Sequence, residues 1–324
     1  MTTGGPRIGI LGGGIVGIFT SLVLSELDPM IISPELGGTW ASGGLKLLKH
    51  HPDIERLLDK YGVSHTSYNV SGGVWWDGEM YDLKDVPQAA QQAHYLKTRG
   101  TMEGYTDKCM NDKAEDERCF EFKYEHFIEL ATNELTQFRA SVSAIVLKDN
   151  YVIVHTDRGA SFGFDFVMSS IPLPQVKSLI QGYHLPDAEC NRISVGSFKA
   201  MVRSPWKRMY VYLPGDGGVH RISRSGLVSQ YWSMETTDDV CAMGTPPLIA
   251  DGYWQDAIPH IQEVLPDARY VKHIGSMLGH LLPLKKPLVY PERITPIGRF
   301  ASWDSRETVD VAIRKVLEWK KTWT

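Results

Sequence analysis

Short apolar runs flank one longer helical segment at the start of the chain. Residues 7–11 (Arg-Ile-Gly-Ile-Leu) predict a short buried strand, and residues 30–32 (Met-Ile-Ile) predict a second one suited to a parallel sheet. Between them, residues 15–27 are typical of a helix, which Asp28-Pro29 would end. The order strand, helix, strand predicts a β-α-β unit.

The rest of the pattern predicts both strands and helices. Strands are favoured in the following segments: 142–146, 151–156, 164–169, 201–213 and 219–232. Residues 271–282 form either a strand or a connection. Helices are favoured at 125–135, 257–265 and 306–320, with Ser305 as the N-cap of the last one. Alternation over residues 209–213 predicts a strand with one buried face.

Glycines mark the junction between the first strand and the first helix. Gly12, Gly14 and Gly17 fit the pattern G-x-G-x-x-G in the strand–turn–helix context that dinucleotide binding requires. Gly12 permits the tight turn, Gly14 lets the backbone approach a pyrophosphate, and Gly17 lets the helix pack closely on the strand. The N–H groups at the helix start, from Ile15 and Val16 onward, would then bind the phosphates. The alternative is a glycine-rich loop without a ligand.

The position after the second strand usually holds an acidic residue that binds a ribose. Ser33 occupies it here, followed by Pro34 and Glu35. We expect Ser33 or Glu35 to bind the ribose. Because no arginine stands there to hold a 2′-phosphate, NADP is disfavoured.

Composition narrows the class of protein. The chain has 324 residues, 43% of them hydrophobic and 22% charged, which predicts a globular protein of two domains or one domain with an insertion. A net charge of −4 provides no strong basic field for nucleic acid. The uncharged stretch 8–25 is better explained by its glycine spacing than as a membrane span. The four cysteines form no C-x-x-C pair, which predicts reduced thiols in a cytoplasmic protein and no metal site.

Two further motifs lie far apart in the sequence. Residues 35–40 (Glu-Leu-Gly-Gly-Thr-Trp) follow the second strand directly, and residues 298–303 (Gly-Arg-Phe-Ala-Ser-Trp) precede the last predicted helix. Together with the glycine motif, they resemble the flavin amine oxidase and UDP-galactopyranose mutase superfamily. The resemblance implies an enzyme with FAD as its cofactor.

The resemblance also implies roles for the matching residues. The element after the second strand would wrap the diphosphate and the flavin end of FAD through Gly37, Gly38, Thr39, Trp40 and Gly44. The main chain near Val142 would contact the adenine. The C-terminal motif would place Gly298 and Arg299 along the cofactor, and the N–H groups of Thr308 and Val309 at the flavin pyrimidine edge.

The implied fold class is α/β. A Rossmann-like FAD-binding domain of the glutathione-reductase type would be built from residues 1–75, 140–180 and 270–324. A mixed α+β substrate domain, residues 76–139 and 181–269, would be inserted between these segments.

Candidate catalytic residues follow the second glycine element. Lys46 falls where the mutases have a histidine facing the flavin, and the resemblance to amine-oxidising enzymes implies that it orders water near the flavin N5. His50 could act as an acid or a base near neutral pH. The alternatives are a surface lysine and, for the pair His50-His51, a helix-start cap or a solvent-exposed turn.

Several reactions remain open at this point. Oxidation of a C–N bond in an amine or amino-acid-like substrate is the first hypothesis, with Tyr105, Tyr212 and Arg221 as candidate substrate residues. The second is mutase-like use of reduced FAD on a nucleotide sugar, because residues 104–110, and residues 71–83 as two strands around a turn at Asp77-Gly78, resemble mutase elements. Candidates to bind the diphosphate are Arg203, Arg208, Arg221 and Arg224, with a solvated basic loop as the alternative. The others are action on an amino-modified base in nucleic acid, and FAD binding without catalysis. No membrane partner is expected.

Overall fold

A five-stranded parallel sheet forms the first layer of the protein. The computed structural model describes residues 5–38, 48–97, 117–201, 208–215, 218–224, 230–241, 251–281, 284–304 and 306–323. The strands run in the order β18-β11-β1-β2-β7, with these bounds: β1 Ile8–Leu11, β2 Met30–Ile32, β7 Gln137–Phe138, β11 Phe166–Ser169 and β18 Ile294–Pro296. All four pairings are parallel. Strand β1 is central, with β2 and β7 on one side of it and β11 and β18 on the other, as in a doubly wound fold.

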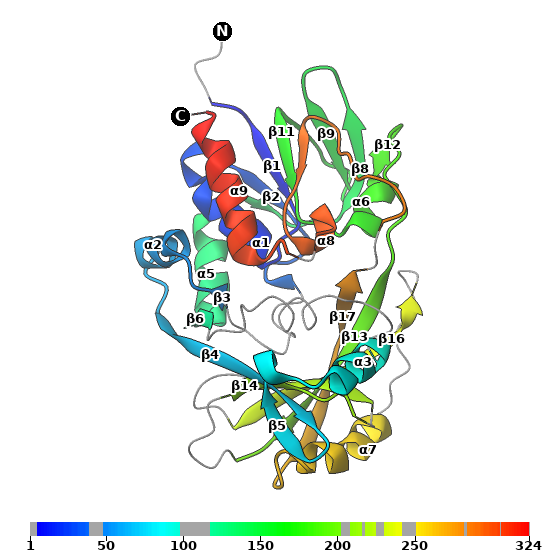
Figure 1. Cartoon of the computed structure of the whole chain (residues 1–324). Coiled ribbons are helices and arrows are strands. Elements are labelled where there is room, and N and C mark those ends of the chain that lie inside the picture. Colours follow the sequence, from blue (N-terminus) through cyan, green and yellow to red (C-terminus); the bar gives the residue numbers. More distant parts are fainter. Residues whose placement is uncertain are drawn as a thin grey trace.

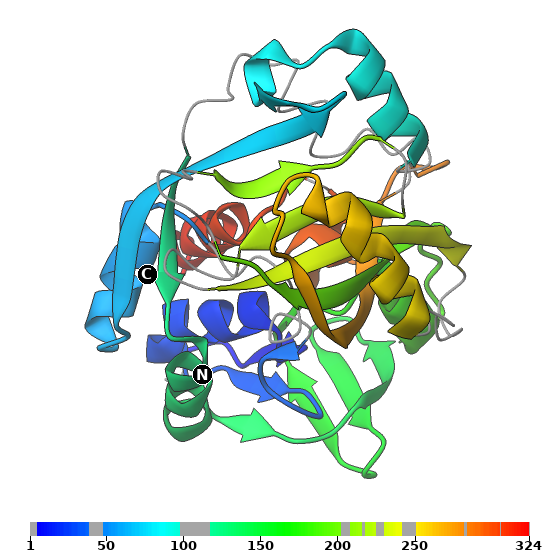
Figure 2. The same ribbon diagram turned by 90° about the horizontal axis from the view of Figure 1, so that it is seen from below.

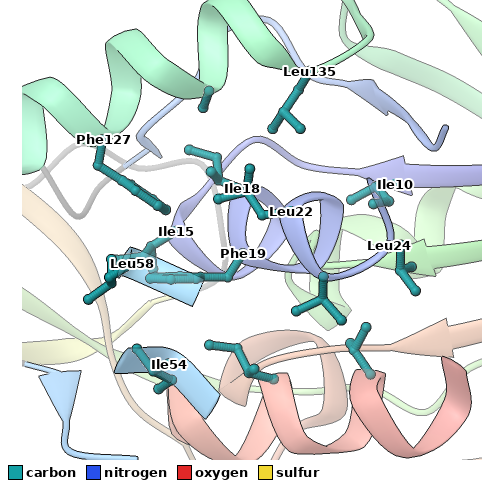
Figure 3. Close-up of a cluster of buried hydrophobic side chains, with 14 of the residues drawn as sticks. Ile10, Ile15, Ile18, Phe19, Leu22, Leu24, Ile54, Leu58, Phe127 and Leu135 are labelled. Carbon is teal, nitrogen blue, oxygen red and sulfur yellow. The ribbon is translucent and has the colours of Figure 1, made fainter. Parts of the chain in front are cut away.

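Helix α1 (Ile15–Val23) packs between α5 (Tyr124–Glu134) and α9 (Val309–Lys321), as Figure 3 shows. Its apolar residues Ile15, Ile18 and Phe19 share one core with Phe127 of α5 and with the last helix. Helix α2 (Pro52–Lys60) contributes to the same core. The predicted helix over 15–27 is shorter than expected, because a 3₁₀ turn, η1 (Ser25–Leu27), follows its α-helical part.

A smaller four-stranded sheet packs beside the parallel one. It is ordered β10-β9-β8-β12 and consists of β8 (Val142–Leu147), β9 (Val152–Thr156), β10 (Ser161–Phe164) and β12 (Ile180–Gln181). Helix α6 (Leu173–Leu179) lies next to it. Apolar residues of this sheet and of α6 share a second core with Leu11 of β1 and Ile32 of β2. This core fixes the four-stranded sheet to the parallel sheet.

A nine-stranded mixed sheet forms the other half of the protein (Figures 1 and 2). Its strands are β3 (Leu48–Lys49), β4 (His65–Trp76), β5 (Glu79–Asp82), β6 (Glu117–Phe122), β13 (Cys190–Lys199), β14 (Arg208–Tyr212), β15 (Val219–Arg224), β16 (Tyr231–Cys241) and β17 (Arg269–Leu281). Helix α7 (Asp251–Gln262) covers the face that points away from the parallel sheet. Helix α3 (Gln88–Lys97) follows the 3₁₀ turn η3 (Leu83–Asp85).

The structure departs from the sequence predictions in this sheet. The segment 219–232 is not one strand, because β15 ends at Arg224 and β16 begins at Tyr231. All of residues 209–213 are buried, whereas their alternation predicted one buried face. The reason is that β14 lies inside the sheet, and apolar residues of two separate hydrophobic clusters pack on its two faces.

The predicted division into two domains stays a prediction. Sheet membership differs from that division, because β3, β4 and β17 lie largely in the segments assigned to the FAD-binding domain but pair within the nine-stranded sheet. Helix α5 and strand β7, by contrast, pack with the parallel sheet. Cys119 and Cys190 are both buried thiols. In the part of the chain that the structure describes, no helix is long and apolar enough to cross a membrane.

Phe127 should contribute strongly to stability, because its fully buried ring contacts Phe19 and Phe122 at centroid distances of 4.7 and 5.4 Å. We expect Phe127→Ala to lower the free energy of unfolding by about 3–5 kcal/mol, measured by urea denaturation. Leu96→Ala is the control, because Leu96 is 66% exposed, and it should change stability by less than about 0.5 kcal/mol. An equal loss of unfolding free energy in Phe127→Ala and Leu96→Ala would contradict this description of the core.

Candidate dinucleotide-binding site

The carboxyl ends of β1, β11 and β18 meet at one edge of the parallel sheet. The Ser170 hydroxyl, just after β11, donates to the main-chain oxygens of Leu11 and Gly12 at 3.1 and 3.2 Å. The Ile297 N–H, just after β18, donates to the Ser169 oxygen at 2.9 Å. Open α/β sheets bind ligands at this edge, where the strand order reverses. The geometry therefore places the two distant glycine motifs at one location.

The first glycine loop is closely packed against its surroundings. Gly12 has a φ of +98°, and its N–H donates to the Ile32 oxygen at 3.0 Å, which ties the turn to the end of β2. A Cβ at Gly17 would overlap the Gly12 carbonyl oxygen, and one at Gly13 would overlap that of Glu35. These positions leave no room for a side chain, which confirms the close helix–strand approach expected at Gly17.

Gly14 differs from the glycines around it. It is the N-cap of α1, with a φ of −66° and a ψ of 175°. A Cβ built on Gly14 would meet no atom within 4 Å among the described residues, its chain neighbours aside. The first turn of the helix, which begins with Ile15 and Val16, has N–H groups without partners within the helix. The helix start is therefore arranged as an anion-binding end.

The second glycine element lies directly against the first. The Gly37 N–H donates to the Gly13 oxygen at 2.7 Å, and Gly14 and Gly37 form an isolated parallel bridge. Gly37 and Gly38 have φ values of +102° and +54°, which glycine adopts without strain. The structure thus brings the two predicted phosphate elements into contact.

Tyr124, at the start of α5, holds this element in place, although the sequence analysis did not identify it. Its hydroxyl donates to the Gly37 oxygen at 2.5 Å. Burial raises the pKa of the Tyr124 phenol above its ordinary value, so the group stays protonated and remains a donor. No local motif marks such a residue, because the contact joins positions far apart in the sequence.

The predicted ribose ligands are adjacent to this loop. The Ser33 hydroxyl donates to the Glu35 oxygen at 2.7 Å, so it retains only acceptor capacity toward a ligand. The Ser33 N–H donates to the Phe138 oxygen at 3.2 Å. Glu35 is exposed. Val142, the predicted adenine contact, begins β8 and packs half-buried in the core that contains Ile32. Contacts of these residues with a ligand stay predictions.

The C-terminal motif forms a turn against the first helix. Gly298 has a φ of +84°, and a Cβ there would lie 3.2 Å from the Val16 side chain. Arg299 begins a short helix, α8 (Arg299–Ser302). The N-cap of α9 is Thr308, so Val309 is its first residue and the predicted cap at Ser305 is wrong. Before α9, the Glu307 N–H donates to the Asp304 oxygen at 3.0 Å and the Thr308 N–H donates to the Arg306 oxygen at 2.8 Å, so the chain forms turns there and the helix starts later than predicted.

The predicted catalytic segment is described only in part. Thr39, Trp40, Gly44, Lys46 and Tyr105 lie outside the described residues. The ring of His50 packs at a tilt against Phe120, with ring centroids 4.7 Å apart, and its Nε2 atom lies 3.3 Å from the Glu55 carboxylate. The helix-start interpretation is confirmed for His51, whose Nδ1 atom accepts from the Asp53 N–H at 3.2 Å and caps α2. Catalysis by His50 stays a prediction.

Two predicted substrate residues are neighbours in the nine-stranded sheet. Tyr212 on β14 is paired with Arg221 on β15. The guanidinium of Arg221 donates to both carboxylate oxygens of Glu235 on β16, at 2.8 and 2.6 Å from Nη2 and 3.0 Å from Nε. Burial alone would lower the pKa of Arg221, but the charge of Glu235 and bonds to Glu235 and Tyr212 outweigh it and raise the pKa.

Two histidines complete this polar cluster. A β-bulge between Val219 and Arg221 lets His220 lie on the same side as Arg221, with its Nε2 atom 3.8 Å from the Glu235 carboxylate. The ring of His94, on α3, meets Tyr212 edge-on at 5.2 Å. Both histidines and Glu235 are less than 5% exposed. The sequence analysis did not identify them, since strand pairing and the packing of α3 bring them together.

Comparisons with known proteins bear on the fold alone. No family model matches the sequence, and no curated protein matches it. Solved structures do match over nearly the whole chain. The reduced UDP-galactopyranose mutase is 12% identical with a TM-score of 0.62, covering 97% of this chain and 94% of its own. Wild-type putrescine oxidase bound to putrescine is 11% identical with a TM-score of 0.62, covering 98% of both chains.

A CLA-producing fatty acid isomerase from P. acnes is 12% identical with a TM-score of 0.61 and 98% coverage of both chains. The chain has the fold of these enzymes. The resemblance seen in the sequence motifs is thereby confirmed at the level of fold, and the Rossmann-like class predicted for the parallel sheet is confirmed as well. The three enzymes differ in their reactions, so their fold does not select one.

The two glycines of the first loop should respond differently to the same substitution. We expect Gly17→Ala to lower the free energy of unfolding by about 1–3 kcal/mol, because the added methyl group would overlap the Gly12 carbonyl oxygen. Gly14→Ala should cost no more than about 1 kcal/mol, because its φ suits alanine and the space is open. Thermal and urea unfolding of both variants without ligand measures the difference. A larger loss in Gly14→Ala would contradict this description of the loop.

Proposed function

We propose that the protein is an FAD-dependent oxidoreductase that oxidises a C–N bond of an amine or amino-acid-like substrate. The observation that supports it most is the convergence of three segments, around Gly14, Gly37 and Gly298, at the carboxyl edge of the parallel sheet. FAD is the dinucleotide that the sequence motifs imply, and the neighbouring structures include oxidases and a mutase.

The residues at this edge fit a dinucleotide. Side chains are sterically excluded at Gly13 and Gly17, while a Cβ at Gly14 would meet no described atom within 4 Å, and a bound pyrophosphate needs such open space beside a helix start. Ser33 or Glu35 would hold the ribose, and the main chain near Val142 would contact the adenine. Gly298, Arg299 and the start of α9 at Thr308 and Val309 would hold the flavin end, with the positive end of the helix dipole favouring negative charge there.

FAD, when bound, supplies the capacity to accept the electrons removed from the C–N bond. The chain's own part is to bind the cofactor, orient the substrate and exclude water. Lys46 and His50 remain the candidates for groups that act on protons near the flavin. Their placement against a substrate is a proposal.

The polar cluster on the nine-stranded sheet supports a substrate with a carboxylate. Val211 and Ile222 pack with Trp254 of α7 on one face, so the alternating residues Tyr212 and Arg221 lie on the opposite face. That face points toward the half of the protein that contains the parallel sheet (Figures 1 and 2). Glu235 fixes the orientation of the Arg221 guanidinium, which is 29% exposed and would present its remaining edge to an anionic group.

Mutase activity is the second candidate, favoured by the hairpin of β4 and β5. Its turn at Asp77-Gly78 has positive φ values and matches the mutase-like element of the sequence. Two arginines that could clamp a nucleotide diphosphate are already engaged by protein groups. Arg221 binds Glu235, and Arg208 binds Asp82 and two main-chain oxygens. Because Arg208 is held by Asp82 and two main-chain oxygens, only Arg221 of the two keeps an edge for an anionic group, whereas a diphosphate clamp needs two arginines; this favours the oxidase proposal over the mutase.

FAD binding is tested with the purified protein after reconstitution with FAD. We expect one flavin per chain with a flavin absorbance spectrum, and Gly14→Ala should raise the Kd for FAD at least about tenfold, because its methyl group occupies the space beside the helix start. A protein that stays colourless after reconstitution would contradict the proposal. A flavin that neither substrate nor sugar affects would instead support FAD binding without catalysis.

The substrate class is tested by anaerobic bleaching of the flavin. We expect amino acids to bleach it faster than the corresponding amines, and Arg221→Lys to raise KM about tenfold for amino acids only, because lysine cannot form the bidentate contact with Glu235 that orients the guanidinium. Equal effects on amino acids and plain amines would remove Arg221 from substrate binding. Turnover of UDP-sugars after dithionite reduction would select the mutase, and salt-sensitive DNA binding would point to a nucleic-acid substrate.

A further inference from the structure

Glu307 is a buried carboxylate beside the C-terminal turn that none of the sequence motifs marks. The residue is 2% exposed, among the most buried charged side chains that the structure describes. It directly precedes Thr308, the N-cap of α9. A carboxylate is costly to bury unless it is paired and hydrogen-bonded, so its partners show what holds it there.

The two oxygens of this carboxylate bind two different elements. Oε1 accepts from the Gly298 N–H at 2.8 Å. Oε2 forms an ion pair with the Lys315 ammonium group, which projects from α9 itself. The Glu307 N–H also donates to the Asp304 oxygen at 3.0 Å, so the main chain is held too. One side chain therefore couples the turn at Gly298 to the beginning of α9.

The hydrogen bond from the Gly298 N–H to Glu307 fixes a turn that joins three elements. Gly298 lies between the end of β18 and the start of α8, in a left-handed conformation with φ +84°. Its own carbonyl accepts from the N–H groups of Ala301 and Ser302, so the turn is fixed from both sides of the residue. The turn packs on Val16, within the first turn of α1. A shift at Gly298 would thus move the C-terminal motif relative to the first glycine loop.

The charges around the start of α9 are also balanced. Glu307 pairs with Lys315, and Asp310 pairs with Arg314 at 3.5 Å. The acidic side chains near this helix end are therefore matched by basic ones from the same helix. The helix dipole remains available to an external negative group instead of being offset by unpaired carboxylates.

We propose that Glu307 is the positioning residue of the flavin half of the site. Its hydrogen bond to Gly298 holds the C-terminal turn and the start of α9 in the arrangement that FAD binds. This role rests on the proposed FAD function, and Glu307 acts through Gly298 without touching the cofactor. FAD affinity therefore depends on a hydrogen-bond acceptor that the residue-307 side chain brings to the Gly298 N–H, and it depends less on the negative charge of that side chain.

The test compares three substitutions at Glu307 by titrating apo-protein with FAD and measuring flavin fluorescence. Glu307→Ala removes the acceptor, and Glu307→Asp keeps the charge but draws it back from Gly298. Both should raise the Kd for FAD about 10- to 100-fold, the range of a hydrogen bond to a charged group. Glu307→Gln keeps an acceptor oxygen at the same reach and should stay within about threefold of the unsubstituted protein.

Glu318→Gln is the matched control, because Glu318 is an exposed glutamate of the same helix that pairs only at the surface with Lys321. It should leave the Kd unchanged. Thermal unfolding of each apo-protein separates a positioning role from a merely structural one. A merely structural role would lower Tm in all three Glu307 variants but leave the Kd of the folded protein unchanged. Normal FAD affinity in Glu307→Asp, or a Kd for Glu307→Gln as weak as for Glu307→Ala, would overturn the inference. No FAD binding by the unsubstituted protein would instead overturn the proposed function.

Discussion

The parallel pairing of β1 with β11 is the constraint on which the rest of the site depends. Ile8 pairs with Phe166, so closing this contact orders a very long loop before any site can form. Once β11 is in place, β18 adds to its outer edge and delivers Gly298 beside the first helix. The core of α1, α5 and α9 then repays the entropy of closure with buried apolar surface. Sheet topology thus brings the first glycine loop and the turn at Gly298 together, and helix packing holds them there.

The two halves of the protein use buried polar groups differently. At the parallel sheet, the important polar contacts are to the main chain: Tyr124 to Gly37, Ser170 to Gly12 and Glu307 to Gly298. They fix backbone shape where a cofactor would bind main-chain N–H groups. In the nine-stranded sheet, the Glu235–Arg221 pair orients one side chain by another, which is suited to recognising a polar substrate group.

The sequence predicted the local features well and the distant contacts poorly. The β-α-β unit, the close packing at Gly17, the C-terminal helix and the hairpin at Asp77-Gly78 all follow from spacing within a few residues, and the structure confirms them. Glu235, Tyr124 and Glu307 were missed because their partners are set by strand pairing and helix packing, which no short motif encodes. The cap predicted at Ser305 was wrong because turns at Glu307 and Thr308 precede α9, whose N-cap is Thr308.

The central claim is that segments from the two ends of the chain build one cofactor site. Amide hydrogen exchange with and without FAD tests it directly, because bound cofactor should slow exchange at both segments together. The account predicts added protection at the start of α1, residues 14–18, and at the C-terminal turn and the start of α9, residues 298–312. FAD binding that protects only one of these segments, or neither, would contradict it.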